Sequence, residues 1–209
     1  MKKCIIFCAG GFDRLVQPIH PEDFIIAADG GLRHTQHLGI TPQLVLGDFD
    51  SLGFIPEGAE VHPIEKDDTD SMLAIKEGLR RGCRTFVLYG CLDGHRVDHT
   101  VANFQALLFL KNRGATGFLV GLSQIAAVFQ QETVNFPAHF KGTLSLFCLG
   151  DTANGITLKG LRYPLQKGDL TPDFPLGVSN RFTGEPASVS IDTGSLLAIW
   201  DTENGVILC

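Results

Sequence analysis

Short apolar runs alternate with helical patterns along the first part of the chain. The apolar runs lack the polar alternation of half-exposed strands, which is typical of strands buried on both faces. They cover Lys3–Cys8, Phe24–Ala28, Leu44–Leu46, Glu60–Ile64, Thr85–Tyr89 and Phe118–Val120. Helical periodicity predicts helices between them, over Leu32–Leu38, Ser71–Arg81 and Asp98–Arg113. This alternation predicts a mostly parallel α/β sheet flanked by helices.

The pattern changes after residue 122, where apolar runs are separated by Gly, Pro, Asn and Asp without a long helix between them. These runs cover Ile125–Phe129, Thr143–Cys148, Gly155–Leu158, Ser188–Asp192 and Leu196–Trp200. Such spacing predicts a smaller all-β sandwich, with a long connection marked by Pro164, Pro172 and Pro175. The chain is therefore expected to form an α/β domain over residues 1–122 and a β-sandwich domain over residues 123–209.

Composition narrows the class of protein. With 209 residues, 44% of them apolar and 19% charged, the chain can bury a sizeable core. A net charge of −6 argues against a nucleic-acid partner. Because no apolar run approaches the ~18 residues of a membrane span, no membrane association is expected, and the protein is predicted to be cytoplasmic. The 6 cysteines contain no C-x-x-C pair, so reduced core thiols are favoured over zinc ligands or disulfides.

Two aspartates follow the third predicted strand. Asp48 and Asp50 lie two positions apart after Gly47, and in near-extended backbone such side chains point the same way. Two carboxylates in one cleft repel each other unless a cation lies between them, and Mg²⁺ prefers oxygen ligands. The pair therefore predicts a metal site at the carboxyl end of the sheet, where ligands bind in open α/β folds. Surface turn residues remain the alternative.

A second acidic run, Asp67-Asp68-Thr69-Asp70, precedes the second predicted helix. Thr69 or Asp68 can cap that helix, and a carboxylate in the first turn interacts favourably with the helix dipole. Capping alone would explain part of the run, but the number of carboxylates exceeds what a cap needs. Together with Asp48 and Asp50, Asp70 gives a three-carboxylate Mg²⁺ site.

The third polar segment, Gly90 to His99, lies between a strand and a helix. Arg96 is a fixed cation suited to phosphate, and Asp98 opens the helix that also carries Asn103. A solvated loop charge is the alternative for Arg96. Glycine pairs at Gly10-Gly11 and Gly30-Gly31 can expose backbone N–H groups to an anion, although tight turns would also explain them. Mg²⁺ with a polyphosphate ester is the chemistry that uses both carboxylates and glycine turns.

Six short motifs, taken in order and at their separations, resemble the thiamine pyrophosphokinase family over nearly the whole chain. They are Ala28-Asp29-Gly30-Gly31, Gly47-Asp48-Phe49-Asp50-Ser51, Asp68-Thr69-Asp70, Arg96-x-Asp98-His99, Gly160-Leu161-Arg162-Tyr163-Pro164-Leu165 and Gly177-Val178-Ser179-Asn180. The resemblance implies a nucleotide-binding α/β domain, a thiamine-binding β-sandwich domain and a homodimer. It also implies Mg²⁺-dependent transfer of the terminal diphosphate of ATP to the hydroxyethyl oxygen of thiamine, which releases AMP.

The resemblance also implies a role for individual residues. Asp48, Asp50 and Asp70 would hold Mg²⁺. The nucleotide would be surrounded by Asp29, Gly30, Gly31, Thr69 and Asn103. Arg96 and Asp98 would be the catalytic pair, with Asp98 accepting or orienting the hydroxyl proton. Ser179 and Asn180 would face thiamine.

Some positions depart from the family pattern. Asp93-Gly94-His95 replaces the usual glycines before the arginine, and Met72 stands where a carboxylate is common. For Trp200, core packing is favoured over a ligand contact. These departures leave open a non-enzymatic nucleotide- or thiamine-binding module, and the D-x-D pair also suits a nucleotide-sugar transferase. A phosphohydrolase with an aspartyl nucleophile is disfavoured, because in that class the D-x-D pair follows the first strand, whereas Asp48 and Asp50 follow the third predicted strand.

Overall fold

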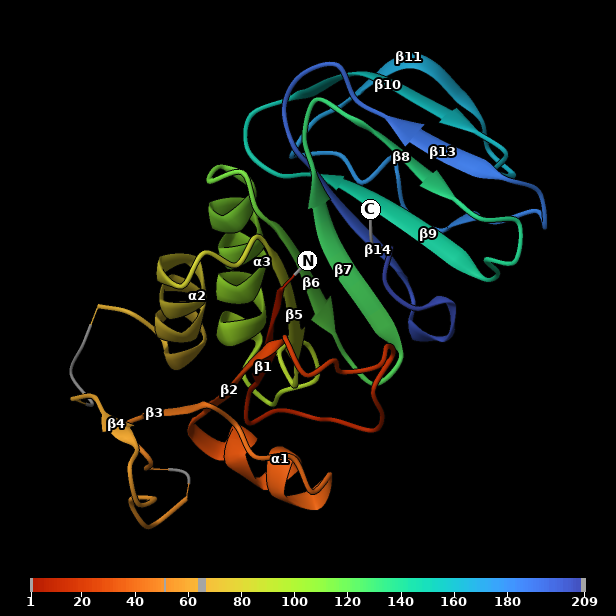
Figure 1. The fold of residues 1–209 in the computed structure, drawn as a ribbon. Helices are drawn as coiled ribbons and strands as arrows, with labels where there is room; N and C mark the ends of the chain where they lie inside the picture. Colours follow the sequence, from red (N-terminus) through yellow and green to blue (C-terminus); the bar gives the residue numbers. More distant parts are fainter. Residues whose placement is uncertain (1, 51, 64–66, 208–209) are drawn as a thin grey trace. The chain divides into compact units, whose positions relative to one another are not determined.

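The computed structural model describes residues 2–50, 52–63 and 67–207 (Figure 1). Ser51 of the second motif and Ile64, the expected end of the fourth strand, lie outside the described residues. The chain divides into two compact units, Met1–Leu122 and Ser123–Cys209. Each unit is described by itself below.

The first unit contains a parallel sheet in the order β6-β5-β1-β2-β3-β4. Its strands are β1 (Lys3–Phe7), β2 (Phe24–Ala28), β3 (Leu44–Gly47), β4 (Glu60–Val61), β5 (Thr85–Tyr89) and β6 (Thr116–Val120). Every residue of β1 and β2 is buried, as the continuous apolar runs predict. The short β4 is exposed at the sheet edge and ends earlier than the expected strand.

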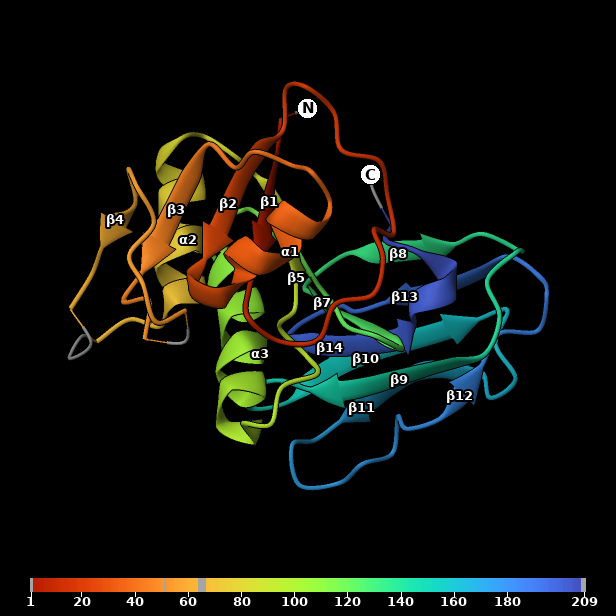
Figure 2. The same cartoon turned by 90° about the horizontal axis from the view of Figure 1, so that it is seen from below.

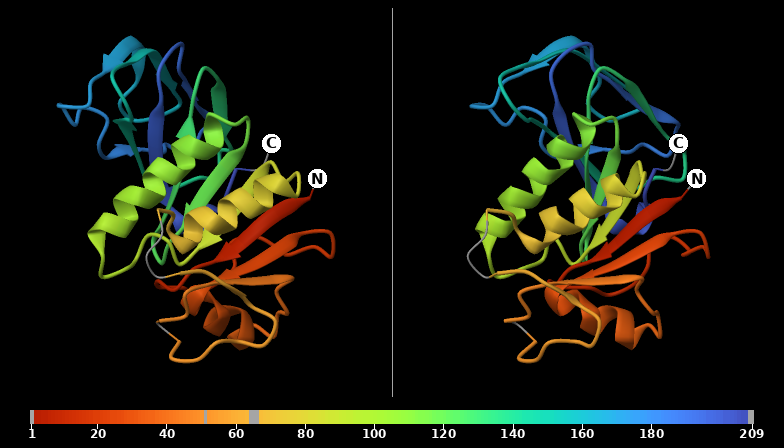
Figure 3. Two further views of the ribbon diagram at one scale, coloured as in Figure 1. Left: turned by 90° about the vertical axis from the view of Figure 1, so that its left-hand side faces the viewer. Right: turned by 60° about the vertical axis from the view of Figure 1, so that its left-hand side comes forward.

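Among the described residues of this unit, three α-helices cover the sheet: α1 (Leu32–His37), α2 (Asp70–Arg80) and α3 (Val97–Lys111), and the short 3-10 helix η1 (Asp29–Gly31) directly precedes α1. Strand order runs outward from β1 to β4 and then restarts on the other side of β1 with β5 and β6. Because crossover connections are right-handed, this reversal places α1 on one face and α2 and α3 on the other, as Figures 2 and 3 show. The reversal between β1 and β5 is a topological switch point, where ligands bind outside the carboxyl ends of the strands.

The second unit is all-β within its described residues, apart from the short helix η2 (Thr202–Asn204). One sheet has the order β12-β9-β14-β7, and a four-stranded sheet has the order β11-β10-β13-β8. The strands are β7 (Gln124–Phe129), β8 (Thr133–Phe136), β9 (Thr143–Cys148), β10 (Ala153–Lys159), β11 (Leu165–Leu170), β12 (Asn180–Arg181), β13 (Ala187–Ser190) and β14 (Leu196–Asp201).

Aromatic side chains fill the core of this unit. Trp200 is fully buried, packs against Phe129 and Phe136, and donates a hydrogen bond from Nε1 to the Gly205 carbonyl at 2.9 Å. Phe136 comes from β8 and Trp200 from β14, so these contacts join the two sheets of the unit. The prediction that Trp200 packs in the core is confirmed.

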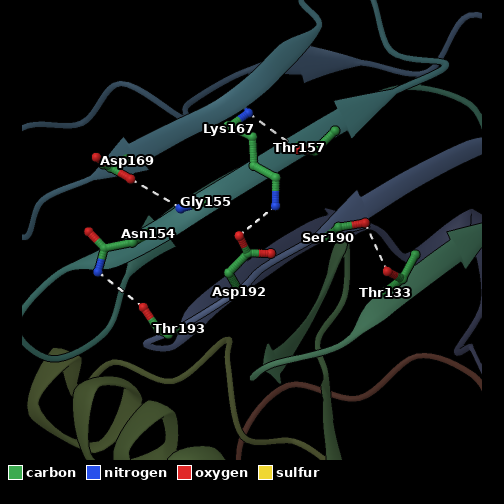
Figure 4. Close-up of polar contacts among 9 residues, drawn as sticks. All are labelled: Thr133, Asn154, Gly155, Thr157, Lys167, Asp169, Ser190, Asp192 and Thr193. Atoms are coloured by element: carbon green, nitrogen blue, oxygen red, sulfur yellow. Dashed lines mark hydrogen bonds and ion pairs between the residues drawn. The ribbon is translucent and has the colours of Figure 1, made fainter.

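The face of the four-stranded sheet that points away from this aromatic core is polar, as Figure 4 shows. Thr133 and Ser190 form a cross-strand hydroxyl pair at 2.9 Å, and Lys167 forms an ion pair with Asp192 at 2.5 Å. Along β13, buried residues alternate with half-buried ones, which is the pattern of a sheet with one face on the core and one toward water.

The predicted fold class, a mostly parallel α/β sheet with helices followed by a smaller all-β part, is confirmed. The prediction of a single long connection around Pro164, Pro172 and Pro175 is wrong, because β11 lies between Pro164 and Pro172 and pairs with β10. Strands β8 and β12 are further elements that the apolar pattern does not predict. Among the described residues, no helix has the length and apolar character needed to span a bilayer.

Candidate functional site

A pocket of about 750 Å³ lies in the first unit, around the carboxyl ends of β1, β2, β3 and β5. Its lining comes from chain segments far apart in sequence: residues 8–11, Ala28, Asp29, Asp48, residues 67–71, Gly90, Cys91, residues 93–96, His99, Thr100 and Asn103. The switch point between β1 and β5 lies at this edge of the sheet. The fold therefore places a ligand-sized cavity where parallel α/β sheets bind their ligands.

Three carboxylates converge at this edge. Asp29, Asp48 and Asp50 each offer one carboxylate oxygen, and these oxygens all lie within 4.8 Å of one another. Asp29 directly follows β2 and adopts a positive φ of 47°. Phe49 has a φ of 61°, so the Asp48–Asp50 segment is a turn rather than the extended backbone expected. The turn is held by a hydrogen bond from the Asp50 N–H to Asp48 Oδ1 at 3.3 Å.

This donor set fits a small hard cation. An octahedral Mg²⁺ with oxygen ligands at ~2.1 Å places those oxygens about 3 Å apart when adjacent and about 4.2 Å apart when opposite. The three carboxylate oxygens lie within 4.8 Å of one another, a bound that exceeds the wider of these separations by about 0.6 Å, so a small inward movement of the side chains would let them share one ion. Asp48 and Asp50 belong to this group as predicted, but the third member among the described residues is Asp29, not Asp70. Asp70 lines the same pocket.

The helix α2 begins at the pocket. Thr69 is its N-cap, and the Thr69 Oγ1 accepts a hydrogen bond from the Met72 N–H at 3.2 Å. Thr69, Asp70 and Ser71 line the pocket, whereas Met72 does not. The first turn of an α-helix carries N–H groups without intrahelical partners and a partial positive charge, so this end of α2 can receive an anion.

Asn103 connects three walls of the pocket. Its side-chain Nδ2 donates to the Cys91 carbonyl at 2.9 Å, and its Oδ1 accepts from the Ser71 hydroxyl at 3.0 Å. The side chain is buried, and both ends of its amide are engaged within the protein. The structure thus gives Asn103 the role of fixing α2 and the segment after β5 to α3. Because Asn103 also lines the pocket, its direct contact with the nucleotide stays a prediction.

Gly30 and Gly31 are buried and lie outside the pocket lining. A Cβ at Gly31 would approach the Phe7 carbonyl oxygen to 1.9 Å, so the glycine allows the chain after β2 to pack directly against β1. This close approach explains the glycine without a phosphate. A contact of Gly30 and Gly31 with the nucleotide stays a prediction, whereas Asp29 of the same motif lines the pocket.

Arg96 and Asp98 are paired with each other. Arg96 Nη2 and Asp98 Oδ2 lie 2.5 Å apart, and both side chains are largely exposed. The hydrogen bond from Arg96 lowers the pKa of Asp98, and the same bond raises the pKa of Arg96. Arg96 lines the pocket, whereas Asp98 does not. A carboxylate with a lowered pKa is a weak proton acceptor, which disfavours the predicted role of Asp98 as a base.

The altered loop Asp93-Gly94-His95 lines the pocket and has a structural role through its aspartate. Asp93 Oδ2 accepts a hydrogen bond from the Leu122 N–H at 2.5 Å, beyond the end of β6. The Asp93 carbonyl accepts from the Gly11 N–H at 3.3 Å. Asp93 therefore ties the glycine pair after β1 to the end of β6, a function that sequence reasoning missed.

The predicted thiamine-facing residues lie in the second unit. Asn180 is buried, and its Oδ1 accepts hydrogen bonds from the N–H groups of Tyr163 and Arg181 at 3.0 and 2.8 Å. Its Nδ2 donates to the Tyr163 carbonyl at 2.7 Å. Asn180 thus holds the chain around Tyr163, and the structure shows a structural role for it. Ser179 is exposed, with a φ of 61°, and its N–H donates to the Ser145 hydroxyl.

A doubly covered α/β sheet with an acidic pocket at its switch point, joined to an all-β unit, defines a class of nucleotide- or phosphate-handling proteins. The family model "Thiamin pyrophosphokinase, catalytic domain" matches residues 15–118, and the model "Thiamin pyrophosphokinase, vitamin B1 binding domain" matches residues 131–196. The chain belongs to the thiamine pyrophosphokinase family.

Individual relatives agree with this assignment. The chain is 26% identical over 214 residues to thiamine pyrophosphokinase of Bacillus subtilis, which covers 96% of this chain and all of that protein. A solved thiamin pyrophosphokinase family protein of Enterococcus faecalis is 26% identical, with a TM-score of 0.79 over 96% of this chain and 99% of that chain. The crystal structure of the Bacillus subtilis enzyme shares the fold, with a TM-score of 0.85 at 23% identity over 96% of this chain and 99% of that chain.

Proposed function

We propose that the protein transfers a diphosphate group from ATP to the hydroxyethyl oxygen of thiamine, forming thiamine diphosphate and AMP. The observation that carries this proposal is a pocket lined by Asp29 and Asp48 of the acidic group, by the N-terminus of α2 and by Arg96. A polyphosphate with its metal ion needs all of these features at once. Family membership supports the same reaction.

Asp29, Asp48 and Asp50 would hold the Mg²⁺ ion, and Asp70 remains a candidate for a further oxygen ligand once the nucleotide is bound. The bound ion would supply neutralisation of the phosphate charge. The first turn of α2, beginning after Thr69, would receive phosphate oxygens through its N–H groups. Arg96 would add a charge-assisted hydrogen bond from the neighbouring loop.

Phosphoryl transfer passes through a loose transition state, so positioning and charge neutralisation matter more than strong base catalysis. This fits the environment of Asp98, whose carboxylate pairs with Arg96 and has a lowered pKa. We assign to Asp98 the orientation of the Arg96 guanidinium toward the phosphates. In this proposal residues 1–122 bind the nucleotide and Mg²⁺, and residues 123–209 bind thiamine, with Ser179 as a candidate contact.

Product analysis tests the proposal directly. Incubation with ATP, Mg²⁺ and thiamine is expected to yield thiamine diphosphate and AMP in equal amounts. Thiamine monophosphate with ADP would indicate an ordinary kinase and refute the diphosphate transfer. Binding of ATP or thiamine without turnover would favour the non-enzymatic module, and consumption of a nucleotide sugar would favour the transferase.

Asp48→Asn tests the acidic group. Loss of one charge from the three-carboxylate set is expected to lower turnover by at least ~100-fold because metal-site chemistry depends on each ligand. Asp13→Asn is the matched control, since Asp13 is exposed and lies outside the pocket lining. Near wild-type activity of Asp48→Asn with added Mg²⁺ would remove Asp48 from the site.

The assembly and location of the protein belong to the same proposal. We expect a homodimer, which sedimentation velocity would distinguish from a monomer. We expect it to act in the cytoplasm, where ATP is the co-substrate and free thiols stay reduced. The five cysteines of the described chain are all free thiols, consistent with such a compartment.

A further inference from the structure

A lysine of α2 pairs with a carboxylate of the pocket wall. Asp68 lies two residues before α2 begins at Asp70, and it lines the pocket. Lys76, in the second turn of α2, donates from Nζ to both carboxylate oxygens of Asp68, at 2.7 and 2.6 Å. Lys76 itself lies outside the pocket lining. The ammonium group therefore reaches a pocket residue from the flank of the helix.

The pairing directs the Asp68 side chain along the helix. Lys76 follows the N-cap Thr69 by seven positions, which is close to two helical turns, so both residues lie on the same side of α2. Two turns rise by ~10.5 Å, and Cα–Cβ bonds tilt toward the helix N-terminus, so Lys76 leans toward Asp68. The carboxylate is held where this ammonium group meets it, on the flank of α2 and not over the N–H groups of its first turn.

Asp68 is neutralised in a different way from the acidic group. The oxygens of that group lie within 4.8 Å of one another, so a cation can offset their charges; its members are Asp29, Asp48 and Asp50. Among the described residues, Asp68 does not belong to this group, and its charge is offset by the ammonium group of Lys76 instead. The protein itself thus supplies the counter-charge for this one carboxylate.

Without that counter-charge, Asp68 would repel a polyphosphate. The N-terminus of a helix carries about half a positive elementary charge, whereas an unpaired carboxylate carries a full negative one. A lone Asp68 carboxylate beside the start of α2 would therefore outweigh the attraction that the first turn offers to phosphate oxygens. Asp67 and Asp70 already add negative charge to this wall of the pocket. Pairing with Lys76 removes one of the three carboxylates of this segment from the charge balance.

We propose that Lys76 is a positioning residue for the triphosphate of ATP: it neutralises Asp68 and keeps the carboxylate away from the phosphate oxygens that the α2 N-terminus receives. Lys76 acts through Asp68 and does not itself contact the nucleotide. The inference rests on the proposed function, because it takes the pocket to bind a polyphosphate. The side chains of Lys76 and Asp68 are 48% and 29% exposed, so the pair contributes little to folding stability. Its effect falls on nucleotide binding.

The test measures ATP affinity by titration calorimetry with Mg²⁺, and the steady-state kinetics of the same variants. Lys76→Met is expected to weaken ATP binding by about five- to tenfold. The KM for ATP should rise by a similar factor with kcat nearly unchanged, because the repulsion acts on the bound substrate and on the transition state alike. Lys76→Arg keeps the charge and should stay within about twofold of the wild type. Lys2→Met is the matched control, since Lys2 is exposed at the amino end of β1, outside the pocket lining.

Removal of the carboxylate should rescue the loss. Asp68→Asn is expected to bind ATP at least as tightly as the wild type, and the double variant Asp68→Asn/Lys76→Met should recover wild-type affinity to within about twofold, because a neutral amide needs no counter-charge. The loss in Lys76→Met should shrink at 0.5 M NaCl and should be smaller for AMP, which carries less charge than ATP. A purely structural role of Lys76 predicts none of these three responses.

Unchanged ATP affinity in Lys76→Met would overturn the inference, as would a double variant that binds ATP no better than Lys76→Met. Weakened binding by Asp68→Asn alone would also overturn it, because Asp68 would then act on the ligand directly. A wild-type protein that binds no ATP would refute the proposed function and this inference together. Failure of the inference alone is recognised by a wild type that binds ATP.

Discussion

Replacing Asn103 by alanine tests whether this residue braces the pocket or contacts the nucleotide. The change removes the hydrogen bonds to the Cys91 carbonyl and from the Ser71 hydroxyl. Each bond is worth roughly 1 kcal/mol net, and an orphaned buried carbonyl costs about 1–3 kcal/mol more. Ser71 keeps its contact with Thr69 Oγ1 at 3.0 Å, so only the carbonyl is left without its partner. A loss of about 3–5 kcal/mol in the unfolding free energy is expected.

The assay is urea unfolding of the protein without ligand, followed by far-ultraviolet circular dichroism. Fluorescence is unsuitable because the single tryptophan, Trp200, lies in the other unit. The expected loss corresponds to a decrease in Tm of roughly 6–20 °C. Gln105→Ala is the control, since it removes an exposed amide from the same helix and should change stability by less than about 0.5 kcal/mol.

The two roles of Asn103 predict different results. A brace lowers the stability of the ligand-free protein, and any loss of ATP affinity follows from the displaced α2 N-terminus. A direct ligand contact lowers ATP affinity and leaves the ligand-free stability unchanged. If Asn103→Ala has the unfolding free energy of the wild type but binds ATP more weakly, the bracing role is refuted.

Two further substitutions test the packing and the charges of the first unit. Gly31→Ala places a Cβ 1.9 Å from the Phe7 carbonyl oxygen, so we expect a loss of at least ~3 kcal/mol or failure to fold. Gly94→Ala, whose Cβ would have no neighbour closer than 3.9 Å, should keep wild-type stability in the same urea titration, and equal losses in the two variants would contradict the close approach. The hydrogen bond from Arg80 lowers the pKa of Glu77 to about 2 from 4.5, which means that Glu77 stabilises the folded state fully above pH 4.5 and loses this effect as pH falls through about 2. The stability difference between wild type and Glu77→Gln should therefore shrink over that range, and a difference that stays constant down to pH 2 would argue against the ion pairs.

The buried strands could be predicted from the sequence because a strand that is buried on both faces consists of an uninterrupted run of apolar residues. Phe24–Ala28 and Thr85–Tyr89 match the structure at both ends. The missed strands β8, β11 and β12 all lie at sheet edges. Edge strands are short and half-exposed, so their residues carry polar side chains, and β11 reads Leu-Gln-Lys-Gly-Asp-Leu. Their existence depends on pairing with β10, β13 or β9, which no local pattern encodes.

In the candidate site, too, features set by neighbouring residues could be predicted from the sequence, whereas roles set by partners far along the chain could not. Thr69 as the cap of α2 is a local feature, and the structure has it as expected. The roles of Asn103, Asn180 and Asp93 depend on partners far along the chain: Cys91, Tyr163 and Leu122. A polar residue that follows a family motif can contact a ligand or hold the backbone around the ligand, and only the geometry separates these roles.

The exchange of Asp70 for Asp29 in the acidic group has a simple topological cause. Strands β2 and β3 are parallel neighbours, with Ala28 opposite Leu46 in the register. Asp29 and Asp48 each follow one of these strands, so the register alone brings them to the same edge of the sheet. Asp70 instead follows the edge strand β4 and begins a helix on one face. Because consecutive strands are neighbours in most sheets, the position of Asp29 directly after the second strand was the available signal for its place in the acidic group.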